Sequence, residues 1–452
     1  MQRSATSICT KLQQQIVQFI NERCINGKPP RGTMKEAREK FNVSASTCTR
    51  YWSEATKQRA RGETMQVINH RKNKPCSRRI QVDLVLLKSL HYTKRGSIRI
   101  LAVGLGCSKS TVGRWVQAGL IRAHTSAIKP DLTAPNKLLR MRFTLEALEL
   151  DRILRKLKFK DMHNTIHIDE KWFYITKGTH RFYMAPEEEE PHRSCKNKQF
   201  ISKIMFMCAV ARPLFGGNGE VLFDGKIGIF PFIERVPAKR NSKNRRAGTI
   251  ETKPIDSITK QVTKDCVINK IIPAIMAKWP EGASKQINIQ QDNAKPHIKN
   301  EDVDFIAAAN QNGFNMKLVQ QPPNSPDTNV NDLGWFRAIQ SLQQQTACNT
   351  LDDLLNAVEK SFHELSPISL DNVFMSLQGC MIEIMKCKGQ NRYKIPHMGK
   401  NALRRSDQLP QNLEVPTQLV ADCIAYLEEQ GHGHNEGIRR IVQDLELENT
   451  QQ

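Results

Sequence analysis

The chain has 452 residues, 39% of them hydrophobic, and a formal net charge of +23, so it is long enough for two or three domains and basic enough to favour a polyanion as partner. No apolar run approaches the roughly 20 residues that span a bilayer, and the first residues (MQRSAT) hold no apolar signal core, so we expect an intracellular protein without a membrane segment. The twelve cysteines are scattered singly without a Cys-x-x-Cys pair, which argues against a disulfide framework or a zinc site.

The first 125 residues carry 24 Lys and Arg against 6 Asp and Glu, a net charge of +18 in about a quarter of the chain. Residues 10–58 predict three helices, broken by the GKPPRG loop at 27–32, with Ser44 as N-cap of the third. A short helix, a tight turn and a helix that carries Arg50 form a helix-turn-helix pattern, whose second helix would present polar side chains to base edges. A basic surface that serves only solubility is the alternative.

The same pattern recurs over residues 82–116. Residues 82–90 and 97–105 predict two apolar helices, residues 106–108 a turn, and residues 109–116 (KSTVGRWV) a candidate recognition helix. The apolar side of this helix would be Val112, Trp115 and Val116. The side left free to face DNA consists of Lys109, Ser110, Thr111 and Arg114. Two basic patterns in tandem predict an all-α, tandem helix-turn-helix DNA-binding domain at residues 1–125.

A basic stretch at residues 71–79 (RKNKPCSRR) lies between the two patterns. A proline and five cations with almost no apolar content are typical of an extended arm, which could follow a minor groove or the phosphates. A solvated linker explains the stretch equally well. The cations that would contact DNA are Arg71, Lys72, Lys74, Arg78 and Arg79.

Residues 126–160 are interpreted as a linker, and a sheet region follows. Strands are predicted at 165–168, 181–184, 204–211, 287–290 and 314–319, and helices at about 261–277, 299–310 and 332–345. The predicted order is three strands, a helix, a strand, a helix, a strand and a helix. This is the order of a mixed ribonuclease-H-like sheet, so we expect an α/β ribonuclease-H-like catalytic domain at residues 161–346. Residues 347–452 predict a helical C-terminal segment with an acidic end.

Residues 212–260 are rich in Gly, Pro and cations and are interpreted as an irregular insertion within the catalytic domain. Their positive charge could grip DNA or serve as a nuclear import signal. The cations in question are Lys239, Arg240, Lys243, Arg245 and Arg246.

Three acidic residues stand where this sheet would gather them. Asp169 and Asp292 end the alternating patterns of two predicted strands, and Asp332 opens a helix for which Asn329 or Asn331 is a candidate cap. Such an arrangement gathers carboxylates at one edge of a sheet, and clustered carboxylates bind the divalent cations that cut and join phosphodiester bonds. A solvated turn residue is the alternative for each acid taken alone.

Several neighbours of the acids have two readings. His297, five residues after Asp292, could approach a scissile phosphate or cap the next helix, and both interpretations stay open. Glu170 and Asp327 are expected to point away from the site. Trp172, Trp335 and Phe336 are expected to pack in the core rather than stack on DNA.

These motifs resemble those of the mariner-like element transposases, in particular the branch best known from plants. The family's first motif is similar to residues 169–174 (DEKWFY), its second to residues 290–294 (QQDNA), and its third to residues 324–341 (NSPDTNVNDLGWFRAIQS). The third acid is Asp, and 39 residues separate it from Asp292, which is similar to the plant-type branch. The chain departs from the family at Thr328, where an apolar residue, commonly Leu, is usual. It also lacks the Gly-Arg-Pro-Arg linker and the Trp-containing dimer motif of animal mariners.

The resemblance implies a transposase in which Asp169, Asp292 and Asp332 hold two Mg²⁺ ions, with Mn²⁺ as a possible substitute. It implies binding of terminal inverted repeats, cut-and-paste cleavage, and strand transfer into TA sites by in-line displacement. Double-stranded DNA would be the partner of a nuclear homodimer, with neither a membrane nor a small-molecule substrate. A domesticated DNA-binding regulator that kept the fold without catalysis is the alternative. A plain ribonuclease H would leave the basic N-terminal region unexplained.

Overall fold

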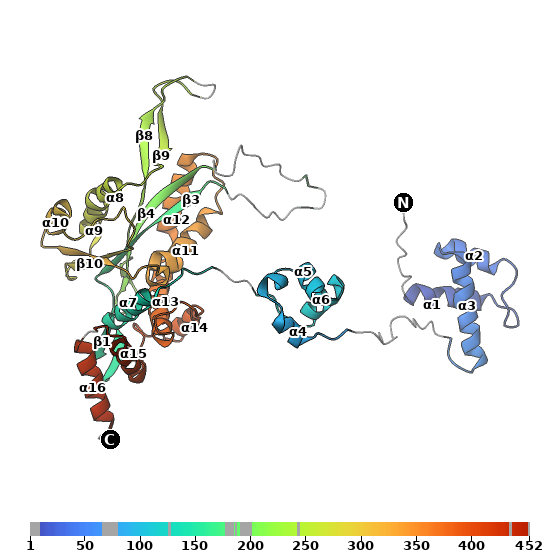
Figure 1. The fold of residues 1–452 in the computed structure, drawn as a ribbon. Coiled ribbons are helices and arrows are strands. Elements are labelled where there is room, and N and C mark those ends of the chain that lie inside the picture. The colour runs from blue at the N-terminus through green and yellow to red at the C-terminus, as the bar shows by residue number, and fades with distance from the viewer. Residues whose placement is uncertain are drawn as a thin grey trace. The chain divides into compact units, whose positions relative to one another are not determined.

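The computed structural model describes residues 10–65, 80–124, 128–176, 185, 188–189, 201–241, 245–433 and 436–450 (Figure 1). The chain divides into two compact units, Met1–Ser126 and Ala127–Gln452, and each is described by itself. In the described ranges, no helix is both long enough and apolar enough to cross a membrane.

The first unit begins with a bundle of three helices, α1 (Thr10–Glu22), α2 (Thr33–Phe41) and α3 (Ala45–Ala60). Ile16 and Ile20 of α1 pack against Trp52 of α3 in a small core. The Ser44 Oγ accepts a hydrogen bond from the Thr47 backbone N–H at 3.2 Å, which confirms the predicted N-cap. The predicted succession of short helix, tight turn and helix is present in α2 and α3.

A second helical group follows, with α4 (Leu84–Ser89), the 3₁₀ helix η1 (Tyr92–Arg95), α5 (Ile98–Gly104) and α6 (Lys109–Gln117). Gly106 makes the turn between α5 and α6 with φ of +62°, a left-handed conformation that glycine adopts without strain. Ser108 then caps α6 by accepting from the Thr111 N–H at 3.1 Å. Val112 and Trp115 lie in the core as predicted, and the Trp115 indole donates to the Ile80 carbonyl at 3.1 Å.

The second unit is built on a five-stranded mixed sheet (Figure 1). Its strands are β3 (Thr165–Tyr174), β4 (Lys203–Ala211), β7 (Lys226–Pro231), β10 (Gln286–Gln291) and β11 (Asn315–Gln320). They lie in the order β11-β10-β3-β4-β7. The pairs β3–β4 and β4–β7 are antiparallel, whereas β10 runs parallel to both β3 and β11. A helical region followed by an α/β sheet domain is therefore the fold class, as the sequence predicted.

The stretch at residues 212–260, which we predicted to be an irregular insertion, contains a strand of the main sheet. Residues 181–184 lie outside the described residues, and the third strand is β7, inside the stretch that we predicted to be irregular. That stretch also holds β5 (Leu214–Phe215), β6 (Val221–Phe223), β8 (Ile233–Pro237) and β9 (Ile250–Pro254). The prediction was wrong because Lys226 opens β7 and disguises its alternation. The Lys226 ammonium is buried but satisfied, since it donates to the carbonyls of His363 at 2.6 Å and Leu365 at 2.9 Å.

Alternation along β3 sends successive side chains to opposite faces of the sheet. Ile166 and Ile168 share a core cluster with residues of the helices on one face. These are α8 (Lys260–Cys266), the π-helix η3 (Val267–Ile271), α9 (Ile272–Lys278) and α10 (Val303–Ala309). His167 and Phe173 face the other side, where the His167 ring lies 5.4 Å from that of Phe374. Asp169 lies two residues after His167, so its side chain points to this second face as well.

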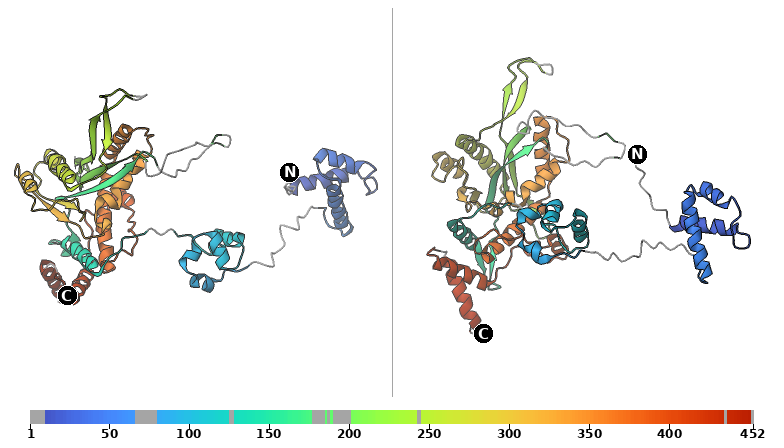
Figure 2. Two further views of the ribbon diagram at one scale, coloured as in Figure 1. Left: turned by 45° about the horizontal axis from the view of Figure 1, so that its top comes forward. Right: turned by 45° about the vertical axis from the view of Figure 1, so that its right-hand side comes forward.

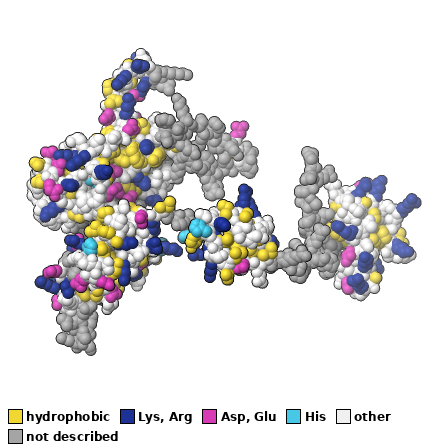
Figure 3. Space-filling model, viewed as in Figure 1, with side chains coloured by type: hydrophobic (Ala, Val, Ile, Leu, Met, Phe, Trp, Pro, Cys, Tyr) yellow, Lys and Arg dark blue, Asp and Glu magenta, His cyan; other side chains and the backbone are white. Residues whose placement is uncertain are grey.

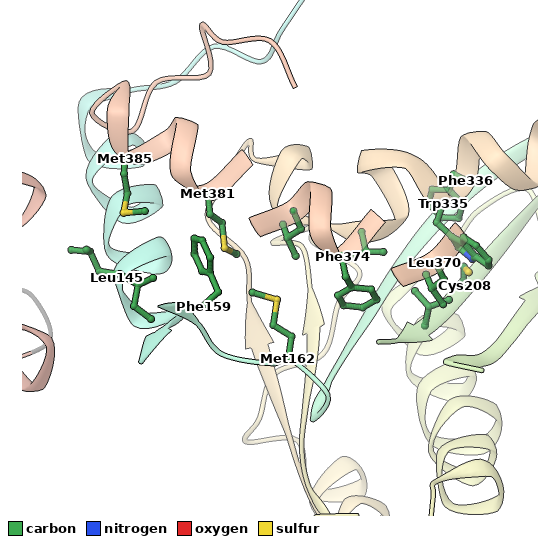
Figure 4. Packing of buried hydrophobic residues seen from close by; sticks show 14 of the residues in the cluster. Leu145, Phe159, Met162, Cys208, Trp335, Phe336, Leu370, Phe374, Met381 and Met385 are labelled. Carbon is green, nitrogen blue, oxygen red and sulfur yellow. The ribbon is translucent and has the colours of Figure 1, made fainter. Parts of the chain in front are cut away.

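The second face is covered by the π-helix η5 (Asn331–Trp335), α11 (Phe336–Gln343), α12 (Leu351–Glu364) and α13 (Pro367–Lys386). Trp335 and Phe336 are buried there, which confirms their predicted role in packing. Figure 4 shows the core that these helices form, with Leu145 and Phe159 near Met381 at one end and Trp335 near Cys208 at the other.

The region predicted as a linker at 126–160 belongs to this core. It contains α7 (Ala134–Glu146), β1 (Leu148–Asp151) and β2 (Lys156–Phe159). Leu138, Met141 and Leu145 follow helical spacing and are buried in the same cluster as α13, so the linker prediction was wrong. The remaining helices are α14 (Lys400–Arg405), α15 (Thr417–Glu429) and α16 (Glu436–Thr450). The C-terminal segment is helical as predicted, and α12, α13, α15 and α16 contribute to the core of the sheet domain.

Candidate catalytic site

Asp169 lies in the middle of β3 and is only 8% exposed. Its Oδ1 accepts a hydrogen bond from the Glu170 backbone N–H at 2.8 Å. Burial, followed by the negative charges of Asp332, Glu170 and Asp292, raises the pKa of the Asp169 carboxyl to about 9. A carboxyl that keeps its proton at neutral pH marks a point at which negative charge is concentrated and positive charge is lacking.

Two buried asparagines fasten the start of the third acid's helix to β3. The Asn329 amide donates to the Ile168 carbonyl at 3.2 Å, and the Asn331 amide donates to the His167 carbonyl at 3.1 Å. The N-cap position of η5 is Val330, so the prediction that Asn329 or Asn331 caps this helix was wrong. Asn329 instead makes a local turn contact, because its Oδ1 accepts from the Asn331 N–H at 3.0 Å. Both side chains are fully buried, so these bonds are costly to break. They hold the turn against the two strand residues that precede Asp169.

Asp332 therefore comes to lie beside Asp169. It occupies the first turn of the π-helix η5, and its negative charge is among the causes that raise the pKa of Asp169. Burial raises the pKa of Asp332, although the charge of Lys171 opposes the shift. Two buried carboxyls that lie close together disfavour each other's ionised form, because their negative charges repel. Isolated π-helical turns are rare and are frequent at functional sites.

Asp292 follows the last residue of β10 and is held by a histidine. The Asp292 Oδ1 accepts from the Ala294 N–H at 2.8 Å and lies 2.9 Å from the His297 Nδ1. The other ring nitrogen of His297 lies 3.0 Å from the Glu170 Oε1. Burial opposes the charge of His297, yet its bonds to Asp292 and Glu170 raise its pKa to about 10. The imidazolium thus bridges two carboxylates.

The contacts of His297 and Glu170 bear on what the sequence predicted for each of these residues. His297 does not cap the next helix, because Asp302 caps α10 by accepting from the Phe305 N–H at 3.2 Å. Glu170 has the opposite parity to Asp169, as predicted, but it remains part of the site's network through His297. In that respect the prediction that it points elsewhere was incomplete.

The donor set fits a hard divalent cation, because carboxylate oxygens are the ligands that Mg²⁺ and Mn²⁺ prefer. In the ranges that the structure describes, no three Asp, Glu, His or Cys side chains lie close enough together to hold one ion. Asp169 and Asp332 form a pair, and Asp292 is engaged by His297. The raised pKa values of Asp169 and Asp332 indicate that negative charge is concentrated here, and a bound cation would offset that charge.

Asp327 points away from this cluster, as predicted. Its two carboxylate oxygens accept from the guanidinium of Arg140 at 2.6 and 2.7 Å, and Tyr393 donates a further hydrogen bond. Arg140 is fully buried and also donates to the Gly389 carbonyl at 2.9 Å. Burial alone would raise the pKa of Asp327, but the bonds from Arg140 lower it. The ion pair ties α7 to the 3₁₀ turn η4 (Pro326–Thr328), which leads into the helix of Asp332.

The departure at Thr328 is accommodated by hydrogen bonds. Thr328 is fully buried, and its hydroxyl donates to the Ser325 carbonyl at 2.7 Å. The Thr328 carbonyl accepts from the amide of Gln290 on β10 at 2.8 Å. Gln290 therefore links the strand of the second acid to the turn before the third, a role that the sequence analysis missed.

The predicted DNA-contacting residues are separate from the acids in the chain and lie in the first unit. Exposed side chains on α3 and α6 include Arg50, Lys109, Ser110 and Arg114. Thr111 is a correction, because it is buried and its hydroxyl contacts Ser108 Oγ at 2.9 Å. It occupies the position whose N–H bonds to the cap, which turns its side chain inward. The described residues do not include Arg71, Lys72, Lys74, Arg78 and Arg79 of this unit, nor Lys243 of the second.

We expect the first unit to bind DNA by itself. In a fragment of residues 1–125, Arg50→Ala or Arg114→Ala should weaken binding to the recognised repeat by about 1–3 kcal/mol if the side chain reads a base. Arg99→Ala, which removes an exposed cation from α5, is the matched control and should weaken repeat and random duplex equally. Fluorescence anisotropy against both duplexes measures the effect. Equal affinity of the unaltered fragment for both duplexes would show that it has no sequence specificity.

Comparison with known proteins gives structural matches of limited closeness. No protein-family model and no curated protein matches the chain. A pre-cleavage Mos1 transpososome aligns at 17% identity and a TM-score of 0.47 over 85% of this chain and 100% of that one. A Mos1 transposase paired-end complex with the left transposon end aligns at 17% identity and 0.46 over 83% and 97%. The catalytic domain of Mos1 mariner transposase aligns at 14% identity and 0.37 over 59% and 100%.

Proposed function

We propose that the chain is a mariner-like DNA transposase of the plant-type branch, with a ribonuclease-H-like catalytic domain. The observation that supports this most strongly is that Asn329 and Asn331 fasten the start of the Asp332 helix to β3, next to Asp169 and to the end of β10, which Asp292 follows. These are the three acids that the motif resemblance singles out. A basic first unit, made of two helical groups with exposed cations, supplies the DNA-binding part.

The acids would hold two divalent cations, Mg²⁺ or Mn²⁺, which would supply the Lewis-acid chemistry that cuts and joins phosphodiester bonds. Asp169, the most buried of the three, is the best placed to contact both ions. Asn329 and Asn331 position Asp332 through the β3 backbone. His297 orients the carboxylate of Asp292 and is a positioning residue in this account.

The proposed substrate is double-stranded DNA, bound at the terminal inverted repeats, cleaved, and transferred into TA sites. Transposition needs both ends held together, and each chain contributes one set of acids, so we propose a homodimer as the active form. DNA as substrate implies that the protein acts in the nucleus.

Cleavage by the purified full chain tests the proposal. The protein should cut duplexes that end in the inverted repeats flanking its own coding sequence when Mg²⁺ or Mn²⁺ is present, and EDTA should stop the reaction. Binding without cleavage under every metal condition would favour the alternative, a DNA-binding regulator that lost catalysis. If the protein neither binds nor cleaves these duplexes, both the transposase and the DNA-binding regulator are rejected.

A further inference from the structure

The ribbon formed by β8 and β9 stands apart from the main sheet. The two strands pair only with each other, in an antiparallel register from Ile233 opposite Pro254 to Pro237 opposite Ile250. In Figures 1 and 2 the ribbon, labelled β8 and β9 in Figure 1, projects from the rest of the second unit. A two-stranded ribbon buries little apolar surface, so its projection calls for a partner or an anchor.

The base of the ribbon is anchored firmly. Phe232 is buried, its N–H donates to the Met205 carbonyl at 2.9 Å, and its carbonyl accepts from the Ile255 N–H at 3.0 Å. On β9, the Thr252 hydroxyl donates to the Asp352 carboxylate at the start of α12 at 2.6 Å. The ribbon therefore leaves the domain in a defined direction.

The strand register shows where the ribbon leaves the sheet relative to the acids. Asp169 on β3 is opposite Cys208 on β4, which is opposite Ile229 on β7. Because β3 and β7 both run antiparallel to β4, they are parallel to each other, and β7 ends two residues beyond the row of Asp169. The ribbon thus leaves the sheet close to the row of Asp169, because Pro231 at the end of β7 lies in the same row as Lys171 of β3.

The ribbon is strongly basic. Residues 233–241 and 245–254 contain six Lys or Arg and two Glu. Arg245 is neutralised by an ion pair with Glu251, whereas Lys239, Arg240 and Arg246 are exposed near the outer end. Figure 3 shows Lys and Arg side chains along the projecting ribbon.

A second chain added as a further strand fits this surface poorly. Pro237 and Pro254 close the two strands, and proline lacks the N–H that an added strand would need. A row of exposed cations instead complements phosphate groups, and a two-stranded ribbon fits a DNA groove.

We propose that the β8–β9 ribbon is an arm that binds phosphates of the DNA duplex, in the stretch of duplex that extends away from the scissile bond held at the three acids. This rests on the proposed function, since it takes DNA as the substrate of those acids. The five residues of β8, from Ile233 to Pro237, span roughly 16 Å at about 3.3 Å each, and the exposed cations lie at the far end of that span. The arm therefore contacts DNA outside the base pairs at the scissile bond.

Duplex binding in EDTA tests the arm without requiring cleavage. In the full chain, the triple variant Lys239→Gln, Arg240→Gln, Arg246→Gln should lower the slope of log affinity against log salt by about 2–3, at roughly 0.9 for each phosphate that the variant no longer neutralises. The charge-keeping variant Lys239→Arg, Arg240→Lys, Arg246→Lys should keep the slope of the unaltered protein and serves as the folding control.

A second control removes three exposed cations elsewhere in the unit, through Arg152→Gln, Lys317→Gln and Arg405→Gln. Its salt slope should stay unchanged. Hydroxyl-radical footprinting should show a patch of protection outside the base pairs at the cleavage point that disappears only in the ribbon variant. An unchanged slope in the ribbon variant, or an equal change in the second control, would overturn the arm. Loss of cleavage by the unaltered protein with metal would instead refute the proposed function, so the two failures are distinguishable.

Discussion

Replacing any one of the three acids with its amide should abolish DNA cleavage while leaving DNA binding intact. We expect Asp169→Asn, Asp292→Asn and Asp332→Asn each to slow cleavage by about 10²–10³-fold or more, the scale on which single groups that stabilise transition-state charge act. The amide keeps the shape of the side chain but removes the charge that would hold a cation. Binding should persist because the exposed cations of α3 and α6 belong to the other compact unit.

Asp256→Asn provides the matched control, because Asp256 is an exposed acid between β9 and α8. Its cleavage rate and repeat affinity should equal those of the unaltered protein. Cleavage at an undiminished rate in any of the three variants would remove that acid from the site. A parallel loss of repeat binding would instead indicate that the substitution damages the fold.

The ion pair between Arg140 and Asp327 should be the largest single contributor to the stability of the turn before Asp332. Arg140→Met leaves a largely buried carboxylate without its guanidinium, which typically costs about 3–5 kcal/mol. Because the turn leads into η5, we also expect cleavage to slow by about 10²-fold, the cost of a catalytic group displaced by about 1 Å. Chemical denaturation and single-turnover cleavage measure the two effects.

Arg142→Met on the same helix is the control. Arg142 is exposed and pairs with Glu146 at 2.8 Å across one helical turn, a contact worth about 0.3–0.5 kcal/mol. The double variant Arg140→Met, Asp327→Asn should recover much of the lost stability, since no uncompensated charge remains. If Arg140→Met proves no more destabilising than Arg142→Met, the ion pair does not hold the turn.

The placement of the acids could be predicted because it depends on local patterns. Alternating patterns that lead to Asp169 and Asp292, and a helix that begins at Asp332, are visible in the residues themselves. The prediction that Asp169 ends its strand was wrong, because β3 continues to Tyr174. The parallel pairing of β3 with β10 nevertheless brings Asp292, which follows β10, close to the row of Asp169. The helical N-terminal patterns were equally readable, because caps such as Ser44 and turn residues such as Gly106 act over a few positions.

The connections between these elements could not be predicted in the same way. The amides of Asn329 and Asn331 bond to β3 residues more than 160 positions away, and local capping explained both residues well enough to hide that role. Arg140 looked like part of a basic linker, because its partner Asp327 is 187 positions further along the chain. Polar side chains satisfied by distant backbone or charge leave no periodic signal.

The same limit explains the errors in the third strand and in the recognition helix. A lysine in a sequence suggests a surface residue. Lys226 is nevertheless buried, because its ammonium donates to the carbonyls of His363 and Leu365. Thr111 reads as a polar residue on the DNA-facing side, but its position one turn after the cap directs it inward. In each case a contact, rather than a residue type, decided the outcome.

Binding of Mn²⁺ to the full chain, measured by the electron paramagnetic resonance signal of the free ion, shows whether the acids hold a metal. The unaltered protein and Asp256→Asn should remove Mn²⁺ from solution equally. Asp169→Asn and Asp332→Asn, which each take away one of the neighbouring carboxyls, should lose this binding. Mn²⁺ binding that is the same in all four proteins would contradict a metal site at these acids.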